Sequence, residues 1–257
     1  MIDDVLWIPA TLLGFAIGSF ANVVAYRVPL GLSVVSPGSA CPRCEHPLAW
    51  RDNIPLVSWL ILRGRCGYCG AAISTRYPIV EAATAALFGA ATLFIGAVWV
   101  LPAYLWFVGV TVALTLTDLD HKLIPNRILF PSSAVGVALL GVGALVDGQL
   151  PDFARALLGA TAYFVLLLIV ALVAKGGFGF GDVKLAWFLG LYAAYLGWSE
   201  LLVAVFLPFA VGGVVSILLL ITRIKGRKDA IPFGPYMVIG VYLAITFGER
   251  IADWYLG

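Results

Sequence analysis

Long runs of apolar residues dominate this chain and restrict what it can fold into. We find eight of them, near residues 6–26, 79–100, 102–117, 128–146, 154–174, 184–197, 201–222 and 235–254. A helix that crosses a bilayer needs about 20 predominantly apolar residues. The sixth run is shorter and carries aromatic residues such as Trp187 and Tyr192, so we expect it to tilt or to lie partly in the membrane interface. The sequence therefore predicts an all-α, polytopic integral membrane protein of about eight transmembrane helices.

The composition excludes a soluble globular protein. Of the 257 residues, 62% are hydrophobic and 12% are charged, whereas soluble domains have about 45–50% apolar and about 25% charged residues. Charge this sparse does not cover a water-facing surface. Met1–Asp4 contains no basic residue and no small-residue cleavage site follows, so we expect the first apolar run to be retained rather than removed as a signal peptide.

The positions of the basic residues predict the topology. If eight helices cross the membrane, four segments lie on the same side, namely 27–78, 118–127, 175–184 and 223–234. Together these segments hold 14 of the 16 Lys and Arg residues, and only Arg155 and Arg250 fall on the other side. Because basic loops stay in the cytoplasm, we predict that the basic side is cytoplasmic and that both termini face outward.

Residues 29–78 form the segment that is large enough for a small module outside the membrane. It holds all four cysteines, as Cys41-Pro-Arg-Cys44 and, 21 residues later, Cys66-Gly-Tyr-Cys69. Two CxxC pairs at this separation are typical of a four-thiolate, structural zinc site, and about fifty residues need such a staple to fold. Two disulfides are the alternative, which a reducing cytoplasm disfavours. Gly70 suits a turn with positive φ after the second pair, and His46 is expected at the surface because four thiolates complete the site.

Other polar residues near this module allow a structural or a functional interpretation. Asn22 can bond to a neighbouring helix, and Asp52-Asn-Ile-Pro55 is typical of a turn. Glu81 is expected in the first turn of the second span, where a carboxylate stabilises the helix dipole. Gly14 and Gly18 are more typical of close helix packing than of chemistry.

Two acidic clusters lie at similar depth on the basic side. Asp118 and Asp120 end the third apolar run, and Asp182 precedes the sixth. Ionisable residues at the ends of membrane helices are costly to desolvate and are candidates for function. If packed helices bring two carboxylates together, both cannot ionise comfortably, so one keeps its proton and acts as an acid while the other activates water.

Asp118 is a better partner for Asp182 than Asp120 is. Residues two apart on a helix point in nearly opposite directions, and Asp118 is the nearer of the two to the apolar run. The structural alternatives are an i,i+4 ion pair between Asp118 and Lys122 and a helix N-cap for Asp182. The glycines within 176–181 either hinge two helices or allow a substrate backbone to approach Asp182 closely.

The motifs, taken in order, resemble those of the type IV prepilin peptidases, which in bacteria combine a leader peptidase with an N-methyltransferase. The matching segments are Gly18–Arg27, the two CxxC pairs, Asp52–Trp59, Arg63–Cys66, Arg76–Glu81, Asp118–Asn126, Gly179–Asp182 and Pro232–Tyr236. They extend over nearly the whole chain. Any one motif is weak, but the ordered set is specific.

This resemblance implies a membrane aspartic endopeptidase of the GxGD type in the bacterial inner membrane. Such an enzyme cuts the basic leader from prepilin or pseudopilin substrates at the cytoplasmic face and then methylates the new N-terminus with S-adenosylmethionine. The family's catalytic aspartates match Asp118 and Asp182. Its zinc-type cysteines match Cys41, Cys44, Cys66 and Cys69. We assign the S-adenosylmethionine site to the neighbourhood of Asn22, Asp52, Asn53 and Glu81.

The expected domains are a first transmembrane helix (1–28), a cytoplasmic zinc-binding, methyltransferase-associated module (29–78) and a transmembrane aspartic peptidase domain (79–257). The expected partners are prepilin substrates and membrane lipid, with no nucleic acid, and the sequence does not indicate an oligomeric state. Two other functions stay open: a peptidase without methyltransferase activity whose module docks substrate, and a cation transporter with a zinc-stapled regulatory loop. The transporter predicts paired, interrupted spans in two halves of the chain, and we find no such symmetry.

Overall fold

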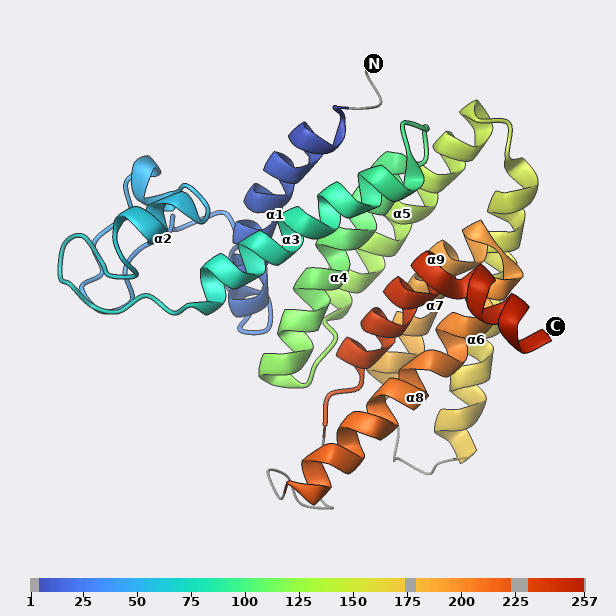
Figure 1. Ribbon diagram of the computed structural model, residues 1–257. Coiled ribbons are helices and arrows are strands. Elements are labelled where there is room, and N and C mark those ends of the chain that lie inside the picture. Colours follow the sequence, from blue (N-terminus) through green and yellow to red (C-terminus); the bar gives the residue numbers. More distant parts are fainter. Residues whose placement is uncertain (1–4, 174–178, 223–230, 257) are drawn as a thin grey trace.

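The computed structural model describes residues 5–173, 179–222 and 231–256, and this part of the chain is helical apart from loops and two isolated bridges (Figure 1). Its elements are α1 (Trp7–Arg27), η1 (Trp50–Asn53), α2 (Val57–Ile61), α3 (Arg76–Ile95), α4 (Leu101–His121), α5 (Asn126–Val146), α6 (Leu150–Val173), α7 (Phe180–Leu196), α8 (Trp198–Ile221) and α9 (Gly234–Leu256). The all-α prediction is confirmed. Gly176 and Gly177, for which a hinge and a close substrate approach are the two alternatives, lie outside the described residues.

Eight of these helices coincide with the eight apolar runs. Within the described residues, six are long and apolar enough to cross a membrane by length and composition, namely α1, α3, α4, α5, α6 and α8. The other two are α7, which has 17 residues and corresponds to the short sixth run, and α9. The described chain therefore has six to eight candidate membrane spans.

Contacts between helix ends show that consecutive long helices run in opposite directions. At one end of the bundle, Arg76 of α3 contacts Asp120 of α4, and Gly234 of α9 contacts Asp118. At the opposite end, Arg155 near the start of α6 contacts the end of α7. We call the first end the carboxylate end. It is the end at which the predicted basic segments join the helices, so the alternation agrees with the charge segregation in the sequence.

Arg155 departs from that segregation for a structural reason. Its guanidinium donates hydrogen bonds to the carbonyl oxygens of Ala194, Tyr195 and Leu196 at 2.5–3.0 Å. It also forms an ion pair with Asp152 at 2.8 Å. The last four carbonyls of a helix have no partner within the helix, and in a membrane an unpaired carbonyl is costly. Arg155 therefore caps α7, the helix that carries Asp182.

The core of the bundle lies between α4 and α7. In α4, 67% of the membrane-length window is buried, the largest share among the six candidate spans. Tyr104 and Phe107 of α4 pack against Phe188 and Tyr192 of α7, with ring centroids 4.5–5.8 Å apart. The Tyr104 hydroxyl also donates to the Tyr192 carbonyl at 3.0 Å. These contacts fix α4 against α7 about three helical turns from Asp118.

Small residues let α1 pack closely along α3. A methyl group on Gly14 would approach Cα of Ala85 to 2.6 Å, and one on Gly18 would approach Cα of Glu81 to 2.9 Å. Contacts this short leave no room for a side chain. The packing interpretation of the two glycines is therefore confirmed.

The start of α3 corrects one prediction. The helix begins at Arg76 rather than near residue 79, because Pro78 is tolerated in the first turn of a helix. Glu81 is therefore the sixth helical residue and lies beyond the first turn. The helix-dipole explanation of Glu81 is wrong, and its carboxylate has a different partner.

The segment between α1 and α3 forms a loop module that extends to one side of the helices (Figure 1). It contains η1, α2 and the two cysteine pairs. Arg27, at the end of α1, donates to the carbonyls of Ser33 and Gly38 and so ties the start of the module to the helix. The Leu56 amide is bonded to Glu81 of α3. The module is thus anchored to both helices that flank it.

Candidate active site and metal centre

Asp118 lies in the last turn of α4 with its carboxylate buried. Only 5% of the residue is exposed. Its Oδ2 accepts a hydrogen bond from the backbone N–H of Gly234 at 3.0 Å. Its own carbonyl accepts the N–H of Lys122 at 2.8 Å, which closes the helix as Lys122 turns into the left-handed region. Among the described residues, no ion pair joins the side chains of Asp118 and Lys122, so the predicted i,i+4 alternative is not seen.

Asp182 is the third residue of α7 and is half-buried. The N-cap of α7 is Gly179, and its N-cap position carries no side-chain hydrogen bond. The N-cap interpretation of Asp182 is therefore wrong. An N-cap at Asp182 would start the helix at residue 183, whereas α7 begins at Phe180. The backbone N–H of Asp182 instead donates to the carbonyl of Gly179 at 3.0 Å, within the first turn.

The glycines that adjoin the two aspartates share one neighbour, Ile124. A methyl group on Gly234, the donor to Asp118, would lie 3.4 Å from Ile124 Cδ1. A methyl group on Gly181, next to Asp182, would lie 3.3 Å from Ile124 Cβ. The structure thus brings both predicted aspartates to the carboxylate end, on adjoining elements.

Two carboxylates in such a place can perform general acid–base chemistry. If the two carboxylates approach each other closely, repulsion disfavours their simultaneous ionisation and the pair then holds one proton. A water molecule bound between them can then lose a proton to one carboxylate while the other protonates a leaving group. This is the chemistry of amide hydrolysis without a covalent intermediate.

Two contacts at this site were not predicted. Gly234 lies in the Pro232–Tyr236 motif. A glycine with a proline on either side within two residues was a signal that the backbone lies close to another group at this position. Lys184, two residues after Asp182, donates to Oδ1 of Asn126 at 2.5 Å and lies 5.3 Å from the ring centroid of Phe180. This hydrogen bond joins the start of α7 to the start of α5.

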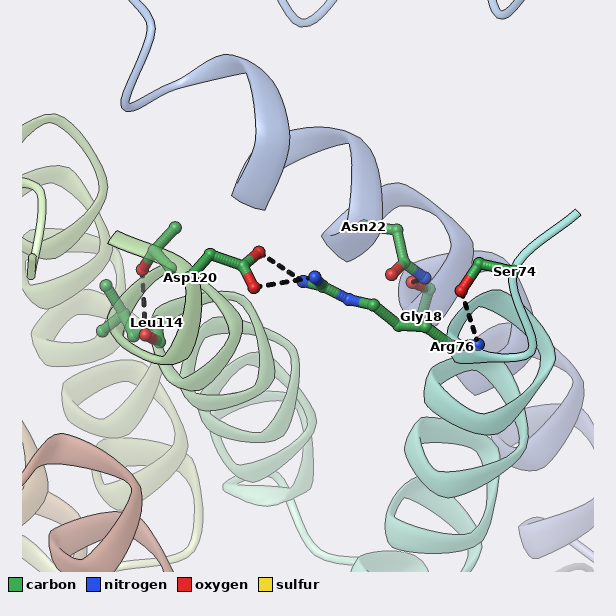
Figure 2. A network of polar contacts seen from close by, with 7 residues as sticks. Gly18, Asn22, Ser74, Arg76, Leu114 and Asp120 are labelled. Atoms are coloured by element: carbon green, nitrogen blue, oxygen red, sulfur yellow. Dashed lines mark hydrogen bonds and ion pairs between the residues drawn. The ribbon is translucent and has the colours of Figure 1, made fainter. Parts of the chain in front are cut away.

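Asp120 points away from this site, as its spacing from Asp118 predicts. Both of its oxygens accept hydrogen bonds from the guanidinium of Arg76, at 2.8 and 2.7 Å (Figure 2). Arg76 is the first residue of α3. The sequence shows both residues but not their pairing, because 44 positions separate them.

Glu81 is buried and holds the loop that contains two of the predicted cofactor residues. Its Oε2 accepts the backbone N–H of Leu56 at 2.6 Å. Leu56 has φ 60° and ψ −49°, a conformation that is rare for a side chain of its size. The strained turn after Pro55 is therefore held by a carboxylate from α3.

The other predicted cofactor residues lie around this contact. Asn22 is buried in α1 and its Nδ2 donates to the carbonyl of Gly18 at 3.1 Å. Asp52, half-buried, and Asn53, exposed, are in η1, shortly before Leu56. The turn predicted for residues 52–55 is thus a short 3₁₀ segment followed by extended backbone.

The four cysteine sulfurs form one cluster. They lie within 4.8 Å of one another, and Cys41 and Cys69 are 3.8 Å apart. A tetrahedral ion with four Zn–S bonds of about 2.3 Å separates its sulfurs by about 3.8 Å. No disulfide joins the four residues. The cluster therefore fits a tetrahedral metal site.

The two cysteine pairs are built as equivalent turns, 25 residues apart. Cys41 N–H donates to the carbonyl of His46 at 3.0 Å, and Cys66 N–H donates to that of Ala71 at 2.8 Å. The residue after each pair has positive φ, 56° at Glu45 and 69° at Gly70, as the sequence predicted for Gly70.

The two thiols of the first turn differ. Although a backbone hydrogen bond at His46 lowers it, the pKa of the Cys44 thiol is raised to about 11 by burial and the neighbouring sulfurs. Backbone N–H groups, that of Cys44 first and then that of Arg43, lower the pKa of the Cys41 thiol to about 6. Metal ligands must be deprotonated. His46 is exposed and stacks on Tyr68 at 3.6 Å between ring centroids, so it lies at the surface as expected.

Comparisons with known proteins agree with this arrangement. Residues 12–95 match the family described as "Bacterial Peptidase A24 N-terminal domain", and residues 105–217 match the "Type IV leader peptidase family". Proteins named prepilin leader peptidase/N-methyltransferase from Aeromonas salmonicida (strain A449) and Pseudomonas aeruginosa are each 36% identical over 95% of this chain, and cover 92% and 91% of their own lengths. The protein of that name from Bacillus subtilis (strain 168) is 33% identical over 95% of this chain and 96% of its own length.

No solved structure gives a significant match to the chain. The two family matches nevertheless cover both the module with its flanking helices and the helices that carry Asp118 and Asp182. Together with the long relatives, they show that this chain belongs to the type IV leader peptidase family.

Proposed function

We propose that this protein is a prepilin leader peptidase and N-methyltransferase, and that Asp118 and Asp182 form its peptidase dyad. The observation that carries the proposal is that Asp118 and Asp182 lie at the same end of the bundle, where Gly234 and Gly181 beside them share the neighbour Ile124. Family membership supports the reaction class, since the matched relatives carry this name. The substrate is a membrane protein whose basic leader lies beside the carboxylate end.

The hydrogen bond from Gly234 supports one division of roles within the dyad. Oδ2 of Asp118 accepts an N–H, and such a bond favours the ionised form of a carboxyl group. We assign Asp118 as the base that takes a proton from the attacking water. Asp182, half-buried at the start of α7, is the acid that protonates the leaving amide nitrogen. Cleavage breaks the C–N bond, adds water across it and returns the pair to one shared proton.

Asparagine substitutions test the dyad. Asp118→Asn and Asp182→Asn keep the size of each side chain but remove its acid–base function, so each should lower leader cleavage by about 100-fold or more. The assay follows a purified prepilin on a gel that separates the precursor from the shorter mature form. Glu249→Gln serves as the carboxylate control, because Glu249 is exposed and lies near the other end of α9. Undiminished cleavage by a folded Asp118→Asn or Asp182→Asn variant would reject the dyad.

We further propose that the module and its flanking helices form the methyltransferase site. S-adenosylmethionine supplies a sulfonium methyl group to the neutral N-terminal amine that cleavage releases. Asn22 and Glu81 are buried beside the module, and among the described residues nothing donates to Oδ1 of Asn22. That oxygen and the side chains of Asp52 and Asn53 are polar groups available to a donor molecule, and Glu81 fixes the loop that presents them.

One incubation separates the possible activities. The protein is mixed with a prepilin and S-adenosylmethionine labelled in its methyl group. We expect cleavage and label on the mature N-terminus. Cleavage without label would identify a peptidase that lacks the methyltransferase activity, and neither product would remove the proposed function altogether. Asp52→Ala should lose label while it retains cleavage.

The metal is proposed to be zinc, held by Cys41, Cys44, Cys66 and Cys69 as a structural ion. The purified protein should contain about one zinc per chain, and Cys44→Ser should lower that content while the helices remain folded. A folded, methylating protein free of metal would contradict this. We also propose that the carboxylate end faces the cytoplasm of a bacterial inner membrane, and that the unit boundaries are 1–28, 29–78 and 79–257.

A further inference from the structure

We propose that Arg76 and Asp120 are positioning residues of the peptidase site: their ion pair fixes the last turn of α4 and so aims the Asp118 carboxylate at Gly234. The inference rests on the proposed peptidase function. It assigns a role to two charged residues that the dyad mechanism does not use.

The pair has the geometry of a strong contact. Two guanidinium nitrogens of Arg76 donate to the two oxygens of Asp120, at 2.8 and 2.7 Å. Their side chains are 39% and 31% exposed. Most exposed ion pairs contribute little, but planar, two-bond Arg–carboxylate pairs are the exception. Figure 2 shows the Arg76 side chain stretched across the gap between α3 and α4, alongside Asn22 of α1.

Local helix electrostatics do not explain these two charges. Arg76 is the first residue of α3 and Asp120 is the last but one of α4. A helix N-terminus favours negative charge and a C-terminus favours positive charge. Each residue therefore has the sign that its own helix end disfavours. The contact between helices, and not the helix in which each residue lies, accounts for the stability of both charges.

The pair acts on the turn that carries Asp118. Positions 118 and 120 are about 200° apart around the helix, so Asp118 faces Gly234 while Asp120 faces α3. The helix ends one residue after Asp120, and Lys122 already has left-handed backbone. The last turn of a helix is prone to fray, because its carbonyl groups have no partners within the helix. Contacts on opposite sides, to Gly234 and to Arg76, hold it in one orientation.

The pair also joins the two matched parts of the chain. Arg76 lies in the part that matches the N-terminal domain family and Asp120 in the part that matches the peptidase family. The same helix, α3, holds the module through Glu81 and Leu56. A displacement of the module is therefore transmitted through α3 to the turn that bears Asp118.

Single substitutions give the first test. Arg76→Gln and Asp120→Asn remove the ion pair and leave side chains of similar size. Each should lower kcat for leader cleavage about tenfold with KM changed less than about twofold, because a misplaced catalytic group slows the chemical step. Amide hydrogen exchange at Lys122 should become faster. Arg250→Gln is the control, since this exposed arginine near the end of α9 forms no ion pair with a described residue.

The exchanged pair gives the decisive test. Arg76→Asp combined with Asp120→Arg restores the contact and now gives each helix end its favoured sign. The double variant should recover kcat to within about threefold of the wild type, with a Tm no lower than that of the wild type. A double variant that regains Tm but not kcat overturns the positioning role, as do single variants with unchanged kcat.

These outcomes are separate from failure of the proposed function. If the wild-type protein cleaves prepilin and Asp118→Asn does not, the peptidase stands, and only the Arg76 and Asp120 variants decide the inference. If the wild-type protein cleaves no prepilin, the proposed function fails first. Hydrogen exchange at Lys122 still reports on the turn in that case, and unchanged exchange in Arg76→Gln overturns the structural part of the inference.

Discussion

Gly234 donates its backbone N–H to Oδ2 of Asp118 at 3.0 Å, across 116 residues of chain. This bond connects the first residue of α9 to the last turn of α4. It also explains why the position holds glycine, since a methyl group there would lie 2.7 Å from the same oxygen. The backbone of α9 is thus part of the environment of the carboxylate.

Gly234→Ala should therefore impair cleavage more than stability. The added methyl group displaces the Asp118 carboxylate, and a displacement of about 1 Å costs up to about 100-fold in rate. Initial rates of leader cleavage check this. Gly213→Ala in α8 is the matched control, because a methyl group at Gly213 meets nothing within 4 Å. Equal rates for the two variants would show that Gly234 has no part in the site.

Substitutions of Glu81 test whether its hydrogen bond with the Leu56 N–H fixes the loop that contains Leu56. Glu81→Gln keeps an oxygen that accepts the Leu56 N–H, whereas Glu81→Leu leaves this donor unsatisfied at a cost of about 1–3 kcal/mol. We expect methylation to survive largely in the glutamine variant and to be lost in the leucine variant. Transfer of labelled methyl groups measures both. Equal loss in the two variants would instead assign the charge of Glu81 to binding or chemistry.

Because the two cysteine turns are equivalent, substitutions at Glu45 and Gly70 should change the rate of metal loss in opposite directions. Both have left-handed backbone, which costs roughly 1–2 kcal/mol for a residue other than glycine. Glu45→Gly should therefore slow the loss of metal to a chelator, and Gly70→Ala should speed it. A colorimetric zinc indicator follows the release. The opposite order of the two rates would disprove the equivalence of the turns.

Arg155→Leu should destabilise the protein, because three carbonyls at the end of α7 lose their donors. Each unsatisfied buried group costs about 1–3 kcal/mol, so Tm should fall by several degrees in detergent. Arg250→Leu removes the other basic residue on that side and serves as the comparison, since Arg250 is exposed. If both variants melt alike, Arg155 is a surface charge and not a cap.

Local pattern was enough to predict the helices and the cysteine cluster. Apolar runs set the number of long helices, and the CxxC spacing by itself brings two sulfurs to each turn. The spacing of Asp118 and Asp120 likewise predicted that only one of them faces Asp182. Each of these inferences depends on residues that are close in sequence.

The features that sequence reasoning missed depend on pairing between distant segments. The hydrogen bond from Leu56 to Glu81 and the Arg76–Asp120 ion pair follow from how α3 packs against the module and α4. The start of α3 lies three residues before the expected apolar run at 79, because a proline such as Pro78 is compatible with the first turn of a helix. The role of Gly234 required the position of α9, which no local pattern fixes.

The aromatic contacts between α4 and α7 determine the direction in which α4 continues toward Asp118. Phe107 is held against Phe188 and Tyr192, and Asp118 lies 11 residues, or about 16 Å, further along the helix. A swing of only about 4° at Phe107 moves the carboxylate by about 1 Å over this length. Substitutions among these rings are therefore expected to shift the Asp118 carboxylate, although they lie about three helical turns from it.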